Sequence, residues 1–269
     1  ITYQEFPPSV YLHPYIECYW TLKIDGCAAL RQELIIPGGR AELIFNFNRS
    51  LIWHDSTADT GVPCPFAFLL GQRNRYFFMS SNGQIDALGI RLRPGGLAQF
   101  TDIPVHYFHS SITALPEVIG PQAEPWLEVL NETPSAIERV ANIEFLLSRK
   151  CRSTLETVNR MELIAAVKQS NAQPVGALCN LTGIHYKKLE RIFRNVAGYT
   201  PKNFVRVMRF YRSLMELRAR KSYLTTISLD GGYYDQSHFI HDFKQFTGVS
   251  PSKFVSRPNL IPDILLKSN

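Results

Sequence analysis

The feature that most constrains this chain is a unit that occurs twice in its C-terminal part. The first copy covers residues 175–205 and the second covers residues 224–255. A unit repeated at a fixed spacing forms the same local structure each time, so one fold has to explain both copies. Five positions return 50 residues later with the same or a similar residue: Leu189, Phe193, Gly198, Pro201 and Phe204 become Phe239, Phe243, Gly248, Pro251 and Phe254.

Each copy has the pattern of a helix-turn-helix motif. A short helix is predicted to end at Gly183 in the first copy and at Gly232 in the second, because glycine readily adopts the left-handed conformation that closes a helix. We therefore expect replacement of Gly232 to unfold the second copy. A second helix follows within a few residues, with apolar positions at helical spacing. These positions are Leu189, Ile192, Phe193 and Val196, and then Phe239, Phe243 and Phe246.

The outward face of each second helix carries hydrogen-bond donors. Lys187, Arg191 and Arg194 lie at positions i, i+4 and i+7, and their counterparts are Ser237, His241 and Lys244. Such donors suit phosphate oxygens and base edges in a DNA major groove; the alternative is an ordinary solvated surface. Two copies with the same stripe favour a DNA reader with two half-sites. The candidate DNA-binding residues are Lys187, Lys188, Glu190, Arg191, Arg194, Gln236, Ser237, Ile240, His241 and Lys244.

A long helix is predicted between the copies, over residues 201–220. At 1.5 Å per residue it spans roughly 30 Å, which is close to one DNA turn of about 34 Å. It can therefore place both second helices in successive major grooves. Its arginines are expected to stay on the polar side: Arg206, Arg209, Arg212, Arg218 and Arg220.

Residues 155–257 resemble the DNA-binding domain of the AraC-type transcription regulators. The second copy carries the most specific part of the resemblance, the run ISLDGGYYDQSHFIHDFKQFTGVSPSKF over residues 227–254. In two places the chain departs from the family pattern. His185 and Tyr186 replace a small polar start of the first recognition helix, and His241 stands where the family usually has arginine, which would make that contact sensitive to pH. The first copy matches the family at Leu178, Cys179, Gly183, Leu189, Arg191, Phe193, Gly198 and Pro201.

Length and charge indicate two domains. The chain has 269 residues, which favours two domains. Residues 1–150 carry a net charge of −4 and residues 151–269 a net charge of +10, giving the +6 of the whole chain. A basic half beside an acidic half predicts a polyanionic partner for the basic half alone. The five cysteines have no metal-site spacing, which favours free thiols: Cys18, Cys27, Cys64, Cys151 and Cys179.

Residues 1–120 alternate short apolar runs with turns rich in glycine and asparagine, as in a β-barrel or sandwich. They also resemble the cupin-like sensor domain of some AraC-type regulators, at residues 37–45 and 88–100. We therefore predict an α+β chain of two domains. Residues 1–150 would form an antiparallel β-barrel with C-terminal helices, and residues 151–269 an all-α domain with two helix-turn-helix motifs joined by a long helix.

The predicted barrel carries no recognisable catalytic site. Its histidines form no metal-binding pattern, and no nucleotide-binding or hydrolase motif is present, so we expect no cofactor, no metal and no enzyme activity. Arg91 and Arg93 could pair with an anionic effector or with local acids. Six aromatic residues either line a ligand pocket or form ordinary core: Tyr15, Tyr19, Trp20, Phe45, Phe47 and Trp53. The four histidines are His13, His54, His106 and His109.

Residues 134–150 are predicted to form a helix with an apolar stripe. The stripe either pairs two protomers or packs on the chain's own barrel, and its members are Ile137, Val140, Ile143, Leu146 and Leu147.

Together these features predict a sequence-specific DNA-binding regulator of transcription in the cytoplasm. Its partner would be double-stranded promoter DNA, with a small-molecule effector, a second protomer and RNA polymerase as further candidates. We expect no membrane association, because no run of 18 apolar residues occurs. The alternatives are a small-molecule-binding module whose DNA binding is weak or vestigial, and a barrel enzyme fused to a DNA reader.

Overall fold

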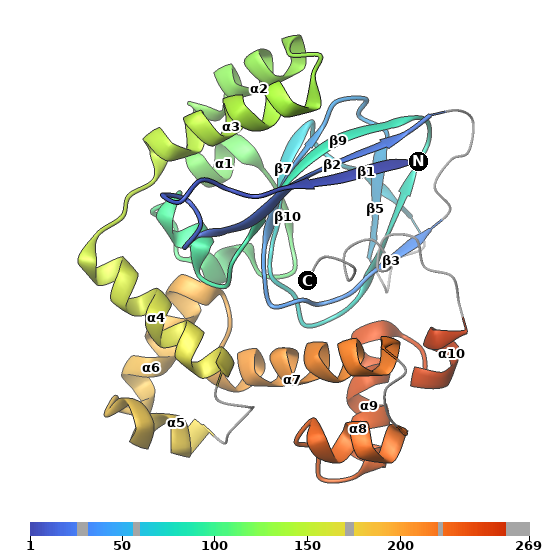
Figure 1. Cartoon of the computed structure of the whole chain (residues 1–269), viewed down its shortest axis with the longest axis vertical. Coiled ribbons are helices and arrows are strands. Elements are labelled where there is room, and N and C mark those ends of the chain that lie inside the picture. The colour runs from blue at the N-terminus through green and yellow to red at the C-terminus, as the bar shows by residue number, and fades with distance from the viewer. Residues whose placement is uncertain (26–31, 56–59, 170–174, 220–222, 257–269) are drawn as a thin grey trace.

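The computed structural model describes residues 1–25, 32–55, 60–169, 175–219 and 223–256. A β-sheet domain forms the N-terminal part, and helices form the C-terminal part (Figure 1). The predicted α+β architecture of two domains is confirmed. Helix α7 (Pro201–Arg218) lies across the open end of the sheets, and the second pair of C-terminal helices lies on its other side (Figure 1).

The described residues form ten strands in two antiparallel sheets. The six-stranded sheet has the order β1-β2-β9-β4-β7-β10, and the four-stranded sheet has the order β3-β8-β5-β6. In the described part of the chain no strand pairing joins the two sheets, so the predicted barrel is open at its edges. The strands are β1 (Thr2–Phe6), β2 (Ile16–Ile24), β3 (Glu33–Ile35), β4 (Glu42–Asn46), β5 (Leu51–Asp55), β6 (Val62–Pro63), β7 (Ala67–Leu70), β8 (Phe77–Ser81), β9 (Ile85–Leu92) and β10 (Ile112–Ala114).

The six-stranded sheet is buried on both faces. Because successive side chains of a strand point to opposite faces, neighbouring residues of β2 and β4 enter different cores. Tyr19 and Phe45 pack toward the helices α1 to α3, while Trp20 and Ile44 pack toward the four-stranded sheet. Burial on both faces explains why these strands read as continuous apolar runs. The sequence did not reveal β1, β6 and β10, which lie at sheet edges and include only two or three residues in the last two cases.

The helices α1 (Leu115–Ile119), α2 (Ala123–Glu132) and α3 (Ala136–Lys150) cover the outer face of the six-stranded sheet. Val140, Ile143 and Leu147 of the predicted apolar stripe are buried in the core that this sheet forms with the helices. The stripe is therefore the inner face of α3, and the expectation that these three residues pair two protomers is wrong. Ile137 is 69% exposed and lies outside that core.

The candidate pocket aromatics separate into different environments. Tyr15, Tyr19 and Phe45 belong to the core under the helices, whereas Trp20 belongs to the core between the sheets. They do not line one pocket, because the alternation of the strands sends them to opposite faces. Phe47 lies under the guanidinium of Arg139. Trp53 is half-buried on β5 and, of the six, is the one that lines a cavity beside α7.

Arg91 pairs with local acids. It is fully buried, its Nε donates to Glu42 Oε1 at 3.0 Å and its Nη1 to Glu5 Oε1 at 3.0 Å. Burial alone would lower its pKa, but the Glu42 carboxylate raises the pKa of Arg91 above its ordinary value. Arg93 lies beyond the end of β9, and its Nε donates to the His13 carbonyl. Neither guanidinium therefore supports the anionic-effector alternative.

Several further expectations can be compared with the described residues. Cys18, Cys64, Cys151 and Cys179 are free, while Cys27 and Arg220 lie outside the described part. Within that part, no cluster of three or more His, Cys, Asp or Glu side chains has the arrangement of a metal site. Nor does any described helix combine the length and the apolar character needed to cross a membrane.

We predict that Ile143→Ala lowers the free energy of unfolding by about 2–5 kcal/mol, because it empties a buried site. The matched control on the same helix is Ile137→Ala, which should stay within about 0.5 kcal/mol because its side chain is largely solvated. Urea unfolding followed by circular dichroism measures both. Equal effects of the two substitutions would contradict the packing of α3 on the sheet.

Candidate nucleic-acid interface

The first repeat folds as a helix-turn-helix unit of α5 (Val175–Thr182) and α6 (Tyr186–Ile192). Gly183 joins the helices with φ +64°, as the sequence predicted. His185 caps α6, since its Nδ1 accepts from the Lys187 backbone N–H at 3.4 Å. Although histidine is unusual there, this contact replaces the cap that a small polar residue would supply. The helix continues through a π-helical turn, Phe193–Ala197.

The second repeat has the same design in α8 (Leu224–Asp230) and α9 (Gln236–Thr247). Gly232 forms the turn with φ +75°. Asp235 caps α9 by accepting the His238 backbone N–H at 2.7 Å. In both repeats a proline then opens the next helix, Pro201 in α7 and Pro251 in α10 (Pro251–Val255). The predicted long helix therefore exists, and it ends at Arg218.

The structure brings most of the candidate DNA-binding residues to the outer side of α6 and α9. Seven are exposed: Lys187, Lys188, Arg191, Arg194, Ser237, His241 and Lys244. Glu190 is half-buried, and Ile240 packs in part against the helical core. Gln236 is also half-buried, and its Oε1 accepts from Thr225 Oγ1 at 3.1 Å. A base contact by Gln236 would therefore compete with this hydrogen bond.

A buried acid holds α9 in place. We call α6 and α9, the second helices of the two repeats, the reading helices. Asp242 lies on the inner side of α9, with 3% of its side chain exposed, and accepts from Arg206 Nη2 at 2.7 Å and Arg209 Nη2 at 3.5 Å. Both arginines belong to α7, so this network ties α9 to the helix between the repeats. The sequence analysis did not single out Asp242. The signal in the sequence is an acidic residue between His241 and Lys244 of the basic stripe, next to the buried Phe243.

Aromatic rings join α7 to both repeats. Phe204 contacts Phe193 of the first repeat, with ring centroids 5.4 Å apart. Phe210 contacts Phe243 and Phe246 of the second repeat at 5.5 and 4.7 Å. Such pairs contribute about 0.5–1.5 kcal/mol each beyond the area that they bury. Helix α7 therefore holds both reading helices in fixed positions and does not act as a flexible linker between them.

The connection between β7 and β8, residues 72–76, touches both repeats. The Arg73 backbone N–H donates to Tyr199 Oη at 3.0 Å, and that hydroxyl donates back to the Arg73 carbonyl at 2.9 Å. A Cβ placed on Gly198 would lie 3.0 Å from Gln72, and one on Gly248 would lie 2.6 Å from Tyr76. Gly198 and Gly248 are equivalent positions of the two repeats. The β domain therefore contacts the end of both reading helices at matching points.

The two Pro-Gly-Gly turns of the β domain also face the helical domain. A Cβ on Gly39 would lie 2.0 Å from the Met208 side chain of α7, so the missing side chain permits this close approach. Nearby, Arg40 Nη2 donates to Tyr211 Oη at 2.8 Å. Gly95 lies against Ile164 and Val196 in the same way. The sequence predicted glycine-rich turns in this domain, and the role of residues 37–39 and 94–96 in the domain contact comes from the tertiary structure.

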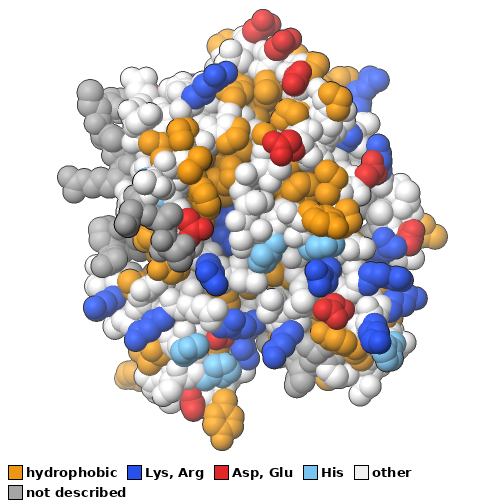
Figure 2. All heavy atoms as spheres, turned by 180° about the vertical axis from the view of Figure 1, so that it is seen from behind, with side chains coloured by type: hydrophobic (Ala, Val, Ile, Leu, Met, Phe, Trp, Pro, Cys, Tyr) orange, Lys and Arg blue, Asp and Glu red, His pale blue; other side chains and the backbone are white. Residues whose placement is uncertain are grey.

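Basic side chains gather over the helical half of the molecule. Figure 2 shows lysine and arginine side chains spread over this half, with exposed hydrophobic side chains over the β half. This distribution follows the charge division of the sequence, +10 in residues 151–269 against −4 in residues 1–150. The helical half therefore has the charge that a polyanionic partner requires.

Comparisons with known proteins identify the two parts of the chain. Residues 178–257 match the family model of a helix-turn-helix domain, and residues 4–113 match a domain of unknown function (DUF6597). The first match spans nearly all of both repeats. A comparison with curated proteins gives no match.

Several solved structures are similar to the chain. ToxT from Vibrio cholerae is 12% identical with a TM-score of 0.47, over 95% of this chain and 98% of that chain. ToxT with an unsaturated fatty acid bound, from strain SCE256, is 11% identical with a TM-score of 0.45, over 87% and 93%. A probable AraC family transcriptional regulator from Rhodopseudomonas palustris CGA009 is 24% identical with a TM-score of 0.31, over 36% and 94%.

Two glycines of the second repeat give a matched test of the domain contact. Gly232 and Gly248 have nearly the same φ, +75° and +76°, but a Cβ on Gly232 meets no atom within 4 Å. The open space reduces the expected cost of Gly232→Ala from unfolding to backbone strain of about 1–2 kcal/mol. Gly248→Ala should lower the free energy of unfolding by about 1–3 kcal/mol more than Gly232→Ala does, because its Cβ meets the Tyr76 ring.

Thermal unfolding of the two single variants and of Gly248→Ala with Tyr76→Ala measures this difference. Removing the Tyr76 ring should abolish the excess cost of Gly248→Ala. Equal destabilisation by Gly232→Ala and Gly248→Ala would show that residues 72–76 do not press on the second repeat.

Proposed function

We propose that this chain, an AraC-type helix-turn-helix regulator of transcription, reads promoter DNA with α6 and α9 and is controlled through its β domain. The observation that carries the proposal is the presence of two equivalent reading helices held by α7, each with donors on its exposed face. Two such helices fit the two half-sites that helix-turn-helix proteins commonly recognise.

The roles of the exposed residues follow from their chemistry. Lys187 and Arg191 lie one turn apart on α6, and Ser237 and His241 lie one turn apart on α9. Arginine and lysine bind guanine O6 and N7, and all of these groups bind phosphate. We propose that phosphate contacts by the basic excess supply most of the affinity, while α6 and α9 supply the sequence preference. Residues 151–269 would then act as the DNA-binding domain.

The β domain, residues 1–150, would regulate without chemistry of its own. Its direct contacts with both repeats offer a route by which a small-molecule effector could change how α6 and α9 are held. We infer that the chain acts as a regulator of transcription rather than as an enzyme, because its C-terminal part matches a helix-turn-helix domain. Ile137 and Phe145 remain exposed on α3 and would serve a second protomer, which sedimentation at several concentrations tests. If the protein activates transcription, it would also contact RNA polymerase bound next to its DNA site. Both contacts would take place in the cytoplasm.

The second candidate function is a small-molecule-binding module with vestigial DNA binding. The observation that favours it is a cavity between the domains, described below. Selection of genomic DNA fragments by the full-length protein, followed by titration of the enriched site at several salt concentrations, separates the two. A regulator should enrich one sequence, and its affinity should fall steeply with salt. Absence of enrichment together with weak binding would favour the vestigial alternative.

Arg191→Ala tests base reading by the first repeat. We expect a loss of about 1–3 kcal/mol at the enriched site and a relaxed preference at one base pair. Fluorescence anisotropy on the enriched and on random duplexes measures both. If affinity for both duplexes falls equally, Arg191 contacts phosphate rather than a base.

His241→Arg tests the second repeat. Arginine is a permanently charged donor that can bind guanine or phosphate through two hydrogen bonds. The variant should therefore bind DNA more tightly than wild type. Fluorescence anisotropy on the enriched duplex measures this, and an unchanged affinity would remove His241 from the contacts.

A further inference from the structure

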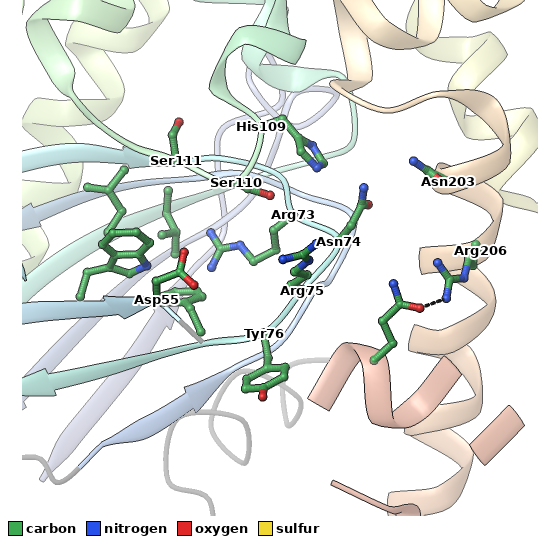
Figure 3. Close-up of a pocket in the computed structure, with 15 residues that line it drawn as sticks. Asp55, Arg73, Asn74, Arg75, Tyr76, His109, Ser110, Ser111, Asn203 and Arg206 are labelled. Atoms are coloured by element: carbon green, nitrogen blue, oxygen red, sulfur yellow. Dashed lines mark hydrogen bonds between the residues drawn. The ribbon is translucent and has the colours of Figure 1, made fainter. Parts of the chain in front are cut away.

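A cavity of about 490 Å³ lies between the domains, where the open end of the sheets meets α7 and α9. Figure 3 shows its walls: Arg73, Asn74 and Arg75 on the β side, with Asn203 and Arg206 of α7 opposite. This volume is within the range of small-molecule sites, about 300–1,000 Å³. The cavity includes part of the connection, residues 72–76, that contacts both repeats.

Arg73 is a buried cation that has no ion-pair partner at salt-bridge distance among the described residues. Only 8% of the residue is exposed; burial lowers the pKa of Arg73, and the Glu42 carboxylate raises it in part through a longer-range charge interaction. Its Nε and Nη2 donate to the Gly71 carbonyl at 3.3 and 2.8 Å, and it stacks over Phe77. Its Nη1 has no hydrogen-bond partner among the described groups.

The contrast with Arg91 shows what is missing. Arg91 is also buried but has two carboxylates, Glu5 and Glu42, at 3.0 Å. Burial lowers the pKa of Arg73 to about 10, so its guanidinium still carries a charge at neutral pH. A buried charge without a close counter-charge is costly, and an anion in the cavity beside the Arg73 guanidinium would relieve part of that cost.

The other walls define the rest of the ligand. Arg75 adds a second cation, and Asp55 is the one carboxylate among the described lining residues. The remaining walls combine hydroxyl and amide groups with apolar and aromatic side chains: Asn74, Ser110, Ser111, Asn203 and Gln245 on the one hand, and Trp53, Leu70, Tyr76, Phe77 and Ile112 on the other. The polar groups suit hydroxyl and carbonyl substituents, and the apolar surface suits the carbon skeleton that carries them.

We propose that this cavity binds a small polar metabolite bearing a carboxylate or phosphate group, with the oxyanion on Arg73 and Arg75. The ligand would touch the β domain together with Asn203 and Arg206 of α7 and Gln245 of α9. This inference rests on the proposed DNA-reading function: occupancy of the cavity would change how residues 72–76 hold the two repeats. The site would thus be the point where effector binding is converted into altered DNA affinity.

Inorganic phosphate and succinate serve as probes of the two oxyanion sources. Full-length protein without DNA is titrated with each at constant ionic strength, and the thermal midpoint is followed. The wild type should show a saturable rise with at least one probe, as expected for binding to the native state. A response to phosphate alone assigns a phosphoryl ligand, and a response to succinate alone assigns a carboxylate.

Two cavity variants and one control locate the binding. Arg73→Met and Arg75→Gln should each weaken binding at least tenfold; Arg75 is exposed, so its variant keeps the test valid if Arg73→Met fails to fold. Arg149→Gln, which removes the same charge from the surface of α3, should bind as wild type does. A rise that never saturates, or one unchanged in both cavity variants, overturns the proposal.

DNA affinity measured in buffer without phosphate or carboxylate keeps the two proposals apart. Saturable anion binding that depends on Arg73, without any DNA binding, would overturn the regulatory function and support the site. Sequence-specific DNA binding without saturable anion binding would overturn the site and leave the regulatory function standing.

Discussion

The burial of α7 on several sides is the constraint on which the rest of the structure depends. Phe204, Phe210 and Leu214 bury their side chains completely, and Met208 is buried toward the β domain. Each side of the helix has a different partner: the first repeat, the second repeat and the sheets. Because protein interiors are closely packed, one partner cannot shift far along α7 without disturbing the others. The helix thereby joins the β domain and both reading helices into one mechanical unit.

Among the contacts described, residues 72–76 are the one segment of the β domain that touches the ends of both reading helices. The bonds between Arg73 and Tyr199 fix the first repeat, and the approach of Tyr76 to Gly248 fixes the second. A single connection that contacts equivalent positions of a duplicated motif can influence both copies together.

The two buried arginines show that burial alone does not define a role. Arg91 is neutralised by Glu5 and Glu42, so it serves the β domain as a closed polar network. Arg73 faces a cavity, where its guanidinium donates to the Gly71 carbonyl and lies over the Phe77 ring but forms no salt bridge with any described carboxylate. Structural networks in which every group is satisfied favour a unique packing, whereas an unsatisfied buried charge indicates a site for a ligand.

The sequence by itself determined the duplicated helix-turn-helix units, the long helix between them and most strands of the β domain. These features depend on local rules: helical spacing of Leu189 and Phe193, left-handed glycines at Gly183 and Gly232, and short apolar runs between turns. Only the tertiary structure decided that Ile143 faces the sheet, that Asp242 ties α9 to α7, and that Arg73 lies in a cavity between domains. The sequence Arg-Asn-Arg at residues 73–75, a basic cluster in an acidic half, was a signal for that cavity. Its meaning depends on partners more than 100 residues away, such as Tyr199 and Arg206, and no local pattern specifies which distant groups meet.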